Sequence, residues 1–148
     1  MAIEIVRLKL QAPLFYVAVN GLLPFDNKEI KGEKLFCFEL DLAQYSNFEP
    51  EKEKFFEKLV FAGEPVDKLN FQQSVKQDPA KKFLEVPRGN YLFFQKQGIL
   101  AREELAVIAA EMQMEGLWQR LKPGNNLYLR YLFEDEKWVT QLLRMTNV

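Results

Sequence analysis

The side chains available for chemistry in this sequence are carboxylates, lysines, tyrosines and one thiol, because histidine is absent from all 148 residues. This absence removes the usual Ser/His/Asp and Cys/His triads together with the commonest metal ligand. With Cys37 as the single cysteine, the sequence also argues against a structural zinc site. The glycines form no phosphate-binding loop motif. We therefore expect no metal ion and no cofactor.

Two charged residues stand out because each lies in an otherwise apolar stretch. Glu39 lies within the segment KLFCFEL, and Arg130 lies within LYLRYLF. A carboxylate buried in such a strand must be paired, be neutralised or face a pocket. The alternative is that Glu39 lies on a solvated face beside a lysine, and Arg130 leaves the same choice open. If both faced one cavity, they could form an ion pair that orients a polar ligand.

Aromatic residues make up 14% of the chain, and several lie on neighbouring predicted strands, where alternate side chains face one side. We interpret part of this set as the lining of an apolar cleft with a few polar tips. The alternative is ordinary packing in the core. With Glu39 and Arg130, the candidate ligand-binding residues are Phe36, Phe38, Tyr91, Phe93, Trp118, Tyr128, Tyr131 and Trp138.

Two other reactive features have simpler interpretations. Cys37 has no histidine partner and no basic neighbour on its strand, so we interpret it as an inert buried side chain and not as a nucleophile. The acidic run at 134–136 is typical of a solvated hairpin turn. We therefore predict no catalytic residue.

Size and charge restrict the class of protein. A chain of 148 residues with 48% apolar residues predicts one domain spanning 1–148, with possible halves 1–78 and 79–148. The net charge is −1 and no basic block occurs, which argues against nucleic acid and anionic membranes as partners. The first ten residues lack a signal-peptide pattern, and no apolar run approaches the ~20 residues that span a bilayer. We expect a cytoplasmic protein.

In the first half of the chain, hydrophobic patterning predicts strands at 3–10, 14–19 and 34–40, the last buried on both faces. A helix is predicted from Pro50 to Ala62, because Pro50 suits a first helical position and Gly63 suits a left-handed stop. A weaker strand is predicted from Leu69 to Lys76.

The second half has clearer signals. Strands are predicted at 83–86 and 91–95, joined as a hairpin by Val86-Pro87-Arg88-Gly89. Apolar residues recur at three and four positions from Ala101 to Leu117, which predicts an amphipathic helix. A turn is predicted at Lys122–Asn125. The segments 127–133 and 138–145 then form a closing hairpin.

The linkers between strands are too short for parallel crossovers. We therefore predict an α+β fold with a mainly antiparallel curved sheet and two helices on one face. Segments 12–21 and 86–98 both run Pro, aromatic strand, polar pair, Gly. This likeness is compatible with pseudo-duplicated β-β-α-β-β units.

Residues 84–148 resemble the gyrase-inhibitor-like (GyrI-like) family. The resemblance rests on LEVPRGNYLFFQKQG, on a helix ending near Gly116-Leu117-Trp118, and on LYLRYLFEDEKWVTQLLRMT. It implies two pseudo-symmetric units around a pocket for organic ligands, as in the effector-binding domains of multidrug-sensing transcription activators. The family pattern Glu-x-Tyr is matched at Tyr131, but Leu129 replaces the acid. This departure implies an apolar or anion-tolerant pocket instead of one that prefers cations.

Three functional hypotheses follow. The first is a stand-alone small-molecule-binding protein with an aromatic-lined cleft and no DNA-reading module. The second, also implied by the resemblance, is a hydrolase of small electrophiles that uses the same cleft, with Glu39 as general base. The third is a protein-interaction module, or a homodimer, whose exposed aromatic residues form an interface.

Overall fold

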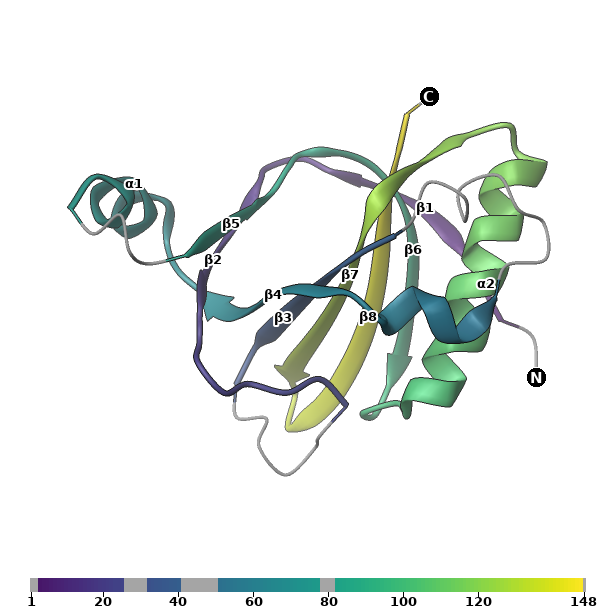
Figure 1. Cartoon of the computed structure of the whole chain (residues 1–148), viewed down its shortest axis with the longest axis horizontal. Coiled ribbons are helices and arrows are strands. Elements are labelled where there is room, and N and C mark those ends of the chain that lie inside the picture. The colour runs from purple at the N-terminus through teal and green to yellow at the C-terminus, as the bar shows by residue number, and fades with distance from the viewer. Residues whose placement is uncertain (1–2, 26–31, 41–50, 78–81, 148) are drawn as a thin grey trace.

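The computed structural model describes residues 3–25, 32–40, 51–77 and 82–147 (Figure 1). The α-helices are α1 (Lys68–Gln77) and α2 (Arg102–Trp118), and a short 3-10 helix, η2, spans Lys52–Phe56. The strands are β1 (Val6–Leu10), β2 (Leu14–Ala18), β3 (Lys34–Glu39), β4 (Leu59–Pro65), β5 (Phe83–Val86), β6 (Gly89–Gln97), β7 (Lys122–Glu134) and β8 (Lys137–Asn147).

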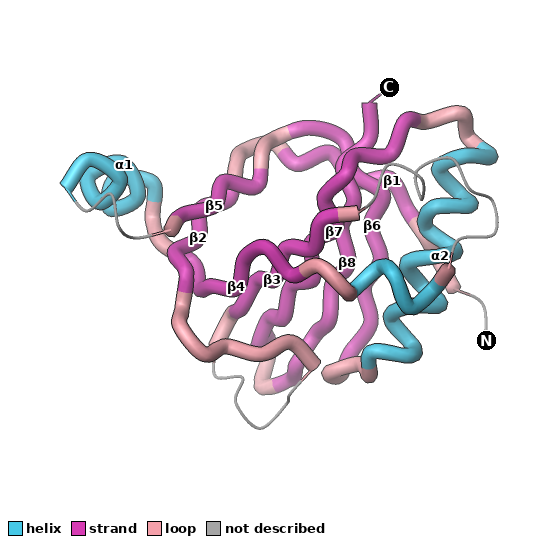
Figure 2. Tube along the Cα trace, viewed as in Figure 1, coloured by secondary structure: helices cyan, strands magenta, loops and turns pink. Residues whose placement is uncertain are grey.

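These strands form one antiparallel sheet in the order β1-β6-β8-β7-β3-β4-β2-β5. The sheet is strongly curved (Figure 2). The predicted α+β class with a mainly antiparallel curved sheet is therefore confirmed. The order of the elements does not confirm the pseudo-duplicated units.

The curvature follows from two short connections between strands that are far apart in the sheet order. Residues 11–13 separate β1 from β2, and residues 87 and 88 separate β5 from β6. The same two segments nevertheless stay paired across both connections. Leu10 of β1 lies opposite Gly89 of β6, and Leu14 of β2 lies opposite Val86 of β5. Segments 6–18 and 83–97 thus form one bent ribbon. Since β2 also pairs with β4, and β6 with β8, the strands close into a ring.

The predicted hairpin at Val86–Gly89 is therefore wrong. Strands β5 and β6 pair with β2 and β1 and not with each other. Gly89 has a φ of 143°, which other residues rarely adopt, and Pro87 has no N–H to donate. Here Pro87 and Gly89 bend the segment 83–97 instead of reversing it. Segment 6–18 pairs with it on both sides of the bend, through β2 with β5 and through β1 with β6.

Alternation along the strands gives the sheet two apolar faces. The inner core lies on the concave face and consists of Tyr16, Leu35, Cys37, Phe61, Val86, Tyr91, Tyr128 and Leu143. Within it, Leu143, Tyr128, Cys37 and Phe61 lie directly opposite one another on adjacent strands. The ring interior is therefore filled with side chains along this row.

The outer core lies on the opposite face of the sheet. It includes Phe36, Phe38, Leu129 and Leu142 from the strands, Phe55 and Phe56 from η2, and Leu105, Ile108 and Met112 from α2. Helix α1 covers the same face further along the sheet. There the ring of Phe71 lies 4.7 Å from that of Phe15 and 5.4 Å from that of Phe83.

Two predicted elements are wrong in type. Residues 59–62, which we predicted to end a helix, belong to β4 between β2 and β3, and Pro50 lies outside the described residues. Gly63 is not a helix stop: a Cβ there would lie 2.2 Å from the carbonyl oxygen of Val17. Residues 69–76 belong to α1 and are not a strand. Asp67 caps this helix by accepting a hydrogen bond from the Asn70 amide at 2.8 Å.

The remaining predictions agree more closely with the structure. The helix predicted at 101–117 and the closing hairpin are present as α2 and β7–β8. The turn predicted at Lys122–Asn125 is an irregularity within β7, where the register with β8 shifts between Pro123 and Leu127.

Replacement of Gly63 by alanine tests the closure of the ring at β4. The added methyl group meets backbone, which cannot give way as a flexible side chain can, so Gly63→Ala should lower the free energy of unfolding by about 3 kcal/mol. Gly21→Ala is the matched control, because Gly21 has a φ of 77° but open space around it; about 1 kcal/mol is expected there. Urea unfolding measures both, and equal losses would contradict the close approach.

Candidate functional site

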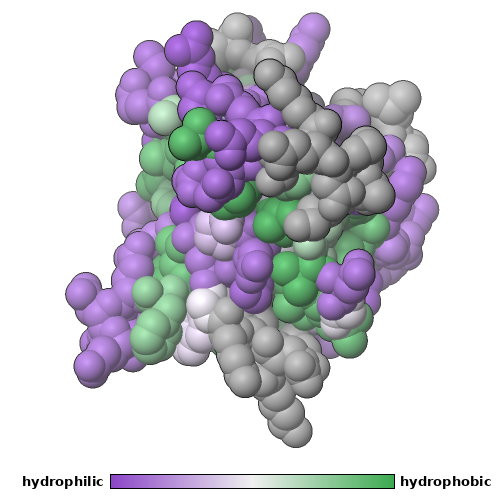
Figure 3. Space-filling view, turned by 90° about the vertical axis from the view of Figure 1, so that its left-hand side faces the viewer, coloured by the Kyte–Doolittle hydropathy of each residue, from purple (hydrophilic) through white to green (hydrophobic). Residues whose placement is uncertain are grey.

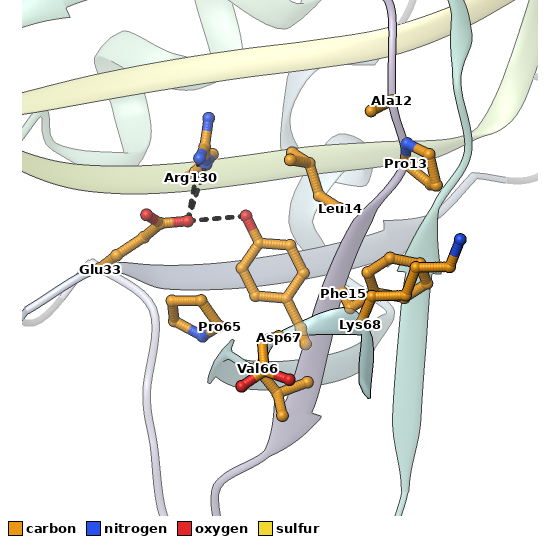
Figure 4. A pocket seen from close by; sticks show the side chains of 11 residues that line it. Ala12, Pro13, Leu14, Phe15, Glu33, Pro65, Val66, Asp67, Lys68 and Arg130 are labelled. Atoms are coloured by element: carbon orange, nitrogen blue, oxygen red, sulfur yellow. Dashed lines mark hydrogen bonds and ion pairs between the residues drawn. The ribbon is translucent and has the colours of Figure 1, made fainter. Parts of the chain in front are cut away.

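A cleft of about 460 Å³ lies where the start of β2 approaches β3, β7 and the end of β4. We call it the Arg130 cleft. It lies on the side of the molecule toward α1, where hydrophobic and hydrophilic surface alternate (Figure 3). It is lined by Ala12, Pro13, Leu14, Phe15, Tyr16, Glu33, Pro65, Val66, Asp67, Lys68 and Arg130 (Figure 4).

The polar part of the cleft belongs to a hydrogen-bonded set that we call the Arg130 network: Tyr16, Glu33, Gln95, Arg130 and Gln141. Tyr16 Oη donates to Glu33 Oε2 at 2.8 Å, and Arg130 Nε donates to the same oxygen at 3.0 Å. Arg130 Nη2 also lies 3.0 Å from Glu33 Oε2. Arg130 Nη1 donates to Gln141 Oε1 at 3.2 Å, and Gln141 Nε2 donates to Gln95 Oε1 at 2.8 Å.

The register of the sheet explains why these residues meet. Gln95, Gln141 and Arg130 lie directly opposite one another on β6, β8 and β7, so their side chains share the concave face. Glu33 precedes β3 and shares this face with Leu35, which lies opposite Arg130. Tyr16 reaches Glu33 from β2, on the far side of β4. The network therefore crosses successive strands, from β6 through β8 and β7 to the start of β3, and then reaches β2 past β4.

Burial fixes the protonation state of Tyr16. Its side chain is almost fully buried, and this burial raises the pKa of the phenol. The positive charge of Arg130 lowers this pKa and the negative charge of Glu33 raises it. Because the net effect is upward, the phenol stays neutral at pH 7 and donates its proton to the Glu33 carboxylate.

The walls of the cleft are mainly apolar. Pro13, Leu14 and Phe15 form one side, and Pro65 and Val66 lie on the segment that leaves β4. In Figure 4 these side chains lie to the right of the Glu33–Arg130 pair and below it. The arrangement can hold the apolar body of a small molecule against a fixed polar pair.

The rim of the cleft carries one charge of each sign. The two Asp67 oxygens accept hydrogen bonds from the backbone and side-chain nitrogens of Asn70, at 2.8 and 2.6 Å. Lys68, at the start of α1, is exposed. With Glu33 and Arg130, the lining thus holds two acidic and two basic side chains.

Of the charged residues singled out in the sequence, Arg130 lies in the cleft and Glu39 does not. Glu39 forms an ion pair with Lys58 at 3.2 Å, with 42% of its side chain exposed, so it lies beside a lysine at the surface. The partner of Arg130 is Glu33 instead. These two side chains are 20% and 24% exposed, which leaves them accessible from the cleft.

The aromatic candidates do not form one cleft, because the sheet separates them. Phe36, Phe38 and Tyr131 belong to the outer core, whereas Tyr91 and Tyr128 belong to the inner core, with Phe93 packed against it. The sequence shows which positions alternate along one strand, but it does not show which face each strand turns to the ring.

The two tryptophans lie elsewhere. Trp118 is 73% exposed at the end of α2. Trp138 packs against the outer core, with its ring 5.1 Å from that of Phe133. Neither residue lines the Arg130 cleft.

Sequence reasoning missed Tyr16, Glu33, Gln95 and Gln141. A signal for the glutamines was present, because each interrupts an apolar strand at an alternating position. Gln95 is in phase with Phe93 and Gln141 with Leu143, so the printed sequence indicates which apolar residue shares a face with each glutamine.

No known family model matches the sequence, and no curated protein gives a significant match to it. Within the part of the chain that the structure describes, no helix is long and apolar enough to cross a membrane. Among the same residues, no group of three or more His, Cys, Asp or Glu side chains is placed to hold a metal ion.

The buried thiol and phenols of the inner core make the fold sensitive to alkali. Burial raises the pKa of Cys37 from 9.0 to about 12, and burial together with nearby Cys37 raises that of Tyr128 from 10.0 to about 12. Raised pKa values mean that the folded state holds these protons more tightly. Their contribution to stability is therefore complete below pH 9 and is lost as the pH rises toward 12.

We expect the free energy of unfolding to fall above pH 9, by ~1.4 kcal/mol per pH unit for each such group. Urea unfolding of the wild type and of Tyr128→Phe between pH 7 and pH 11 measures this. The variant should lose stability less steeply above pH 10. Identical slopes would show that Tyr128 does not contribute.

A double-mutant cycle tests the Glu33–Arg130 pair. Glu33→Gln and Arg130→Gln, singly and together, should give a coupling free energy of about 1–2 kcal/mol, because the pair is largely buried and further hydrogen-bonded. The matched cycle at Glu39 and Lys58 should give less than about 0.5 kcal/mol, because that pair is exposed. Equal coupling in the two cycles would contradict the network.

Proposed function

We propose that this chain is a small-molecule-binding protein and that its ligand occupies the Arg130 cleft. The observation that carries the proposal is the combination of apolar walls with a convergent polar pair. The volume of about 460 Å³ lies within the ~300–1,000 Å³ that is usual for ligand pockets. Glu33 and Arg130 supply the groups that would fix a ligand's orientation.

Preorganisation supports this proposal. Arg130 is held by Glu33 and Gln141, and Glu33 is held in turn by Tyr16. A ligand that binds here does not have to order these side chains, so less of its binding free energy is lost to conformational entropy. The polar pair therefore suits recognition better than a flexible surface pair would.

The GyrI-like resemblance also implies an organic ligand held by a curved sheet. The residues proposed here to contact the ligand differ from those of that family. Leu129, where that family usually has an acid, is buried in the outer core. The polar groups offered to a ligand are those of Tyr16, Glu33 and Arg130. A role like that of an effector-binding domain remains part of the proposal.

Two alternative functions, a hydrolase and a protein-interaction module, are each supported by a specific observation. A hydrolase would use Glu33 as the acid in the cleft, because Glu39 is paired with Lys58 outside it. An interaction module would use exposed aromatic residues such as Trp118 and Phe133, which are 73% and 53% exposed. Mass analysis of incubated compounds would reveal hydrolysis, and a size that depends on protein concentration would reveal self-association.

A thermal-shift screen against a chemically broad set of small aromatic and aliphatic compounds tests the proposal. A ligand present at about 100 times its Kd should stabilise the fold by ~2.7 kcal/mol, which raises the unfolding midpoint by several degrees. Ala12→Trp should abolish this rise, because Ala12 is an exposed residue of the cleft wall and an indole there occupies the space.

Ala101→Trp is the matched control, because Ala101 is also exposed and does not line the cleft. This variant should keep the ligand-induced rise. Loss of the rise in both variants, or in neither, would place the ligand elsewhere and contradict the proposal.

A further inference from the structure

The lining of the Arg130 cleft is balanced in charge. Glu33 and Arg130 already neutralise each other at 3.0 Å, and the rim carries one charge of each sign, on Asp67 and Lys68. A small ion that enters the cleft would lose hydration without meeting an uncompensated charge on the Glu33–Arg130 pair. The cleft therefore favours neither a carboxylate nor an ammonium group.

The pair nevertheless retains unused hydrogen-bonding capacity. The contacts of Glu33 with Tyr16 and Arg130 all converge on Oε2, so Oε1 takes part in none of the hydrogen bonds among the described residues. The guanidinium of Arg130 carries more N–H groups than its contacts with Glu33, Gln141 and Tyr16 use. The pair thus keeps both an acceptor and donors for a ligand.

We infer that the Arg130 cleft recognises a neutral ligand in which an amide-type group, with adjacent N–H and C=O, is attached to an apolar body. The C=O accepts from a terminal N–H of Arg130, and the N–H donates to Glu33. The apolar body lies against Pro13, Leu14 and Pro65. Such a group satisfies both partners without breaking the ion pair between them. This inference rests on the proposed function and names the ligand class.

Three probes of nearly equal size test it: 3-phenylpropanamide, 3-phenylpropanoate and 3-phenylpropylammonium. Each carries the same phenyl chain, and at pH 7 they are neutral, anionic and cationic. Dissociation constants come from titrations of the intact protein followed by protein NMR. The amide should bind at least about tenfold more tightly than either ion.

Two variants show whether the ion pair sets this preference. Glu33→Gln leaves Arg130 uncompensated, so the preference should change to the carboxylate. Arg130→Met leaves Glu33 uncompensated, so it should change to the ammonium. The NMR spectra of the free variants establish that both are folded. If either ion binds the wild type as tightly as the amide, or if both variants keep the wild-type order, the inference is overturned.

The failure of this inference is distinguishable from that of the proposed function. If an ion binds best and Ala12→Trp abolishes its binding, the cleft is a ligand site of another class. If no probe binds, the inference of an amide ligand is wrong. The thermal-shift screen then tests the proposed function independently. If the amide binds equally to the wild type and to Ala12→Trp, both proposals fail.

Discussion

The bend in the two-stranded ribbon is the constraint on which the rest of the structure depends. Segments 6–18 and 83–97 keep their pairing through the bend, so the two ends of the sheet are drawn together. This closure gives the sheet a concave face that holds Tyr91, Tyr128 and Cys37 and a convex face that packs on α2. It also brings β2 across from β7. The arrangement of the candidate site is a consequence of the curved sheet and not of any local motif.

The parts of the fold that could be predicted from sequence are those governed by local patterns. The helix at 102–118 and the β7–β8 hairpin follow from apolar periodicity and from a polar turn between two strands. The segment 59–65 could not be assigned correctly, because its apolar residues fit either a helix or a buried strand. The segment forms a strand because it pairs with β2 on one side and with β3 on the other. Glycine is required at position 63 because the carbonyl oxygen of Val17 approaches closely.

The candidate site was predicted in part, for a related reason. Arg130 was identifiable because a charge within an apolar strand needs a partner, and it does line the cleft. Its partner could not be chosen correctly, because Glu33 precedes the third strand and Glu39 ends it, at positions with the same alternation. Which of them meets Arg130 depends on the register of β3 against β7, where Arg130 lies opposite Leu35. The register between two strands that are far apart in the sequence cannot be predicted from the local pattern of either strand.

The measurement that tests the central claim most directly is a map of backbone amide NMR shifts on addition of 3-phenylpropanamide. If the Arg130 cleft is the ligand site, the largest changes should cluster at residues 12–16, at Glu33, at residues 65–68 and at Arg130, and should saturate together. These positions are far apart in the sequence and meet only because β2, β4, β3 and β7 are neighbours in the curved sheet. Saturable changes that cluster instead around Trp118 or Phe133 would contradict the account.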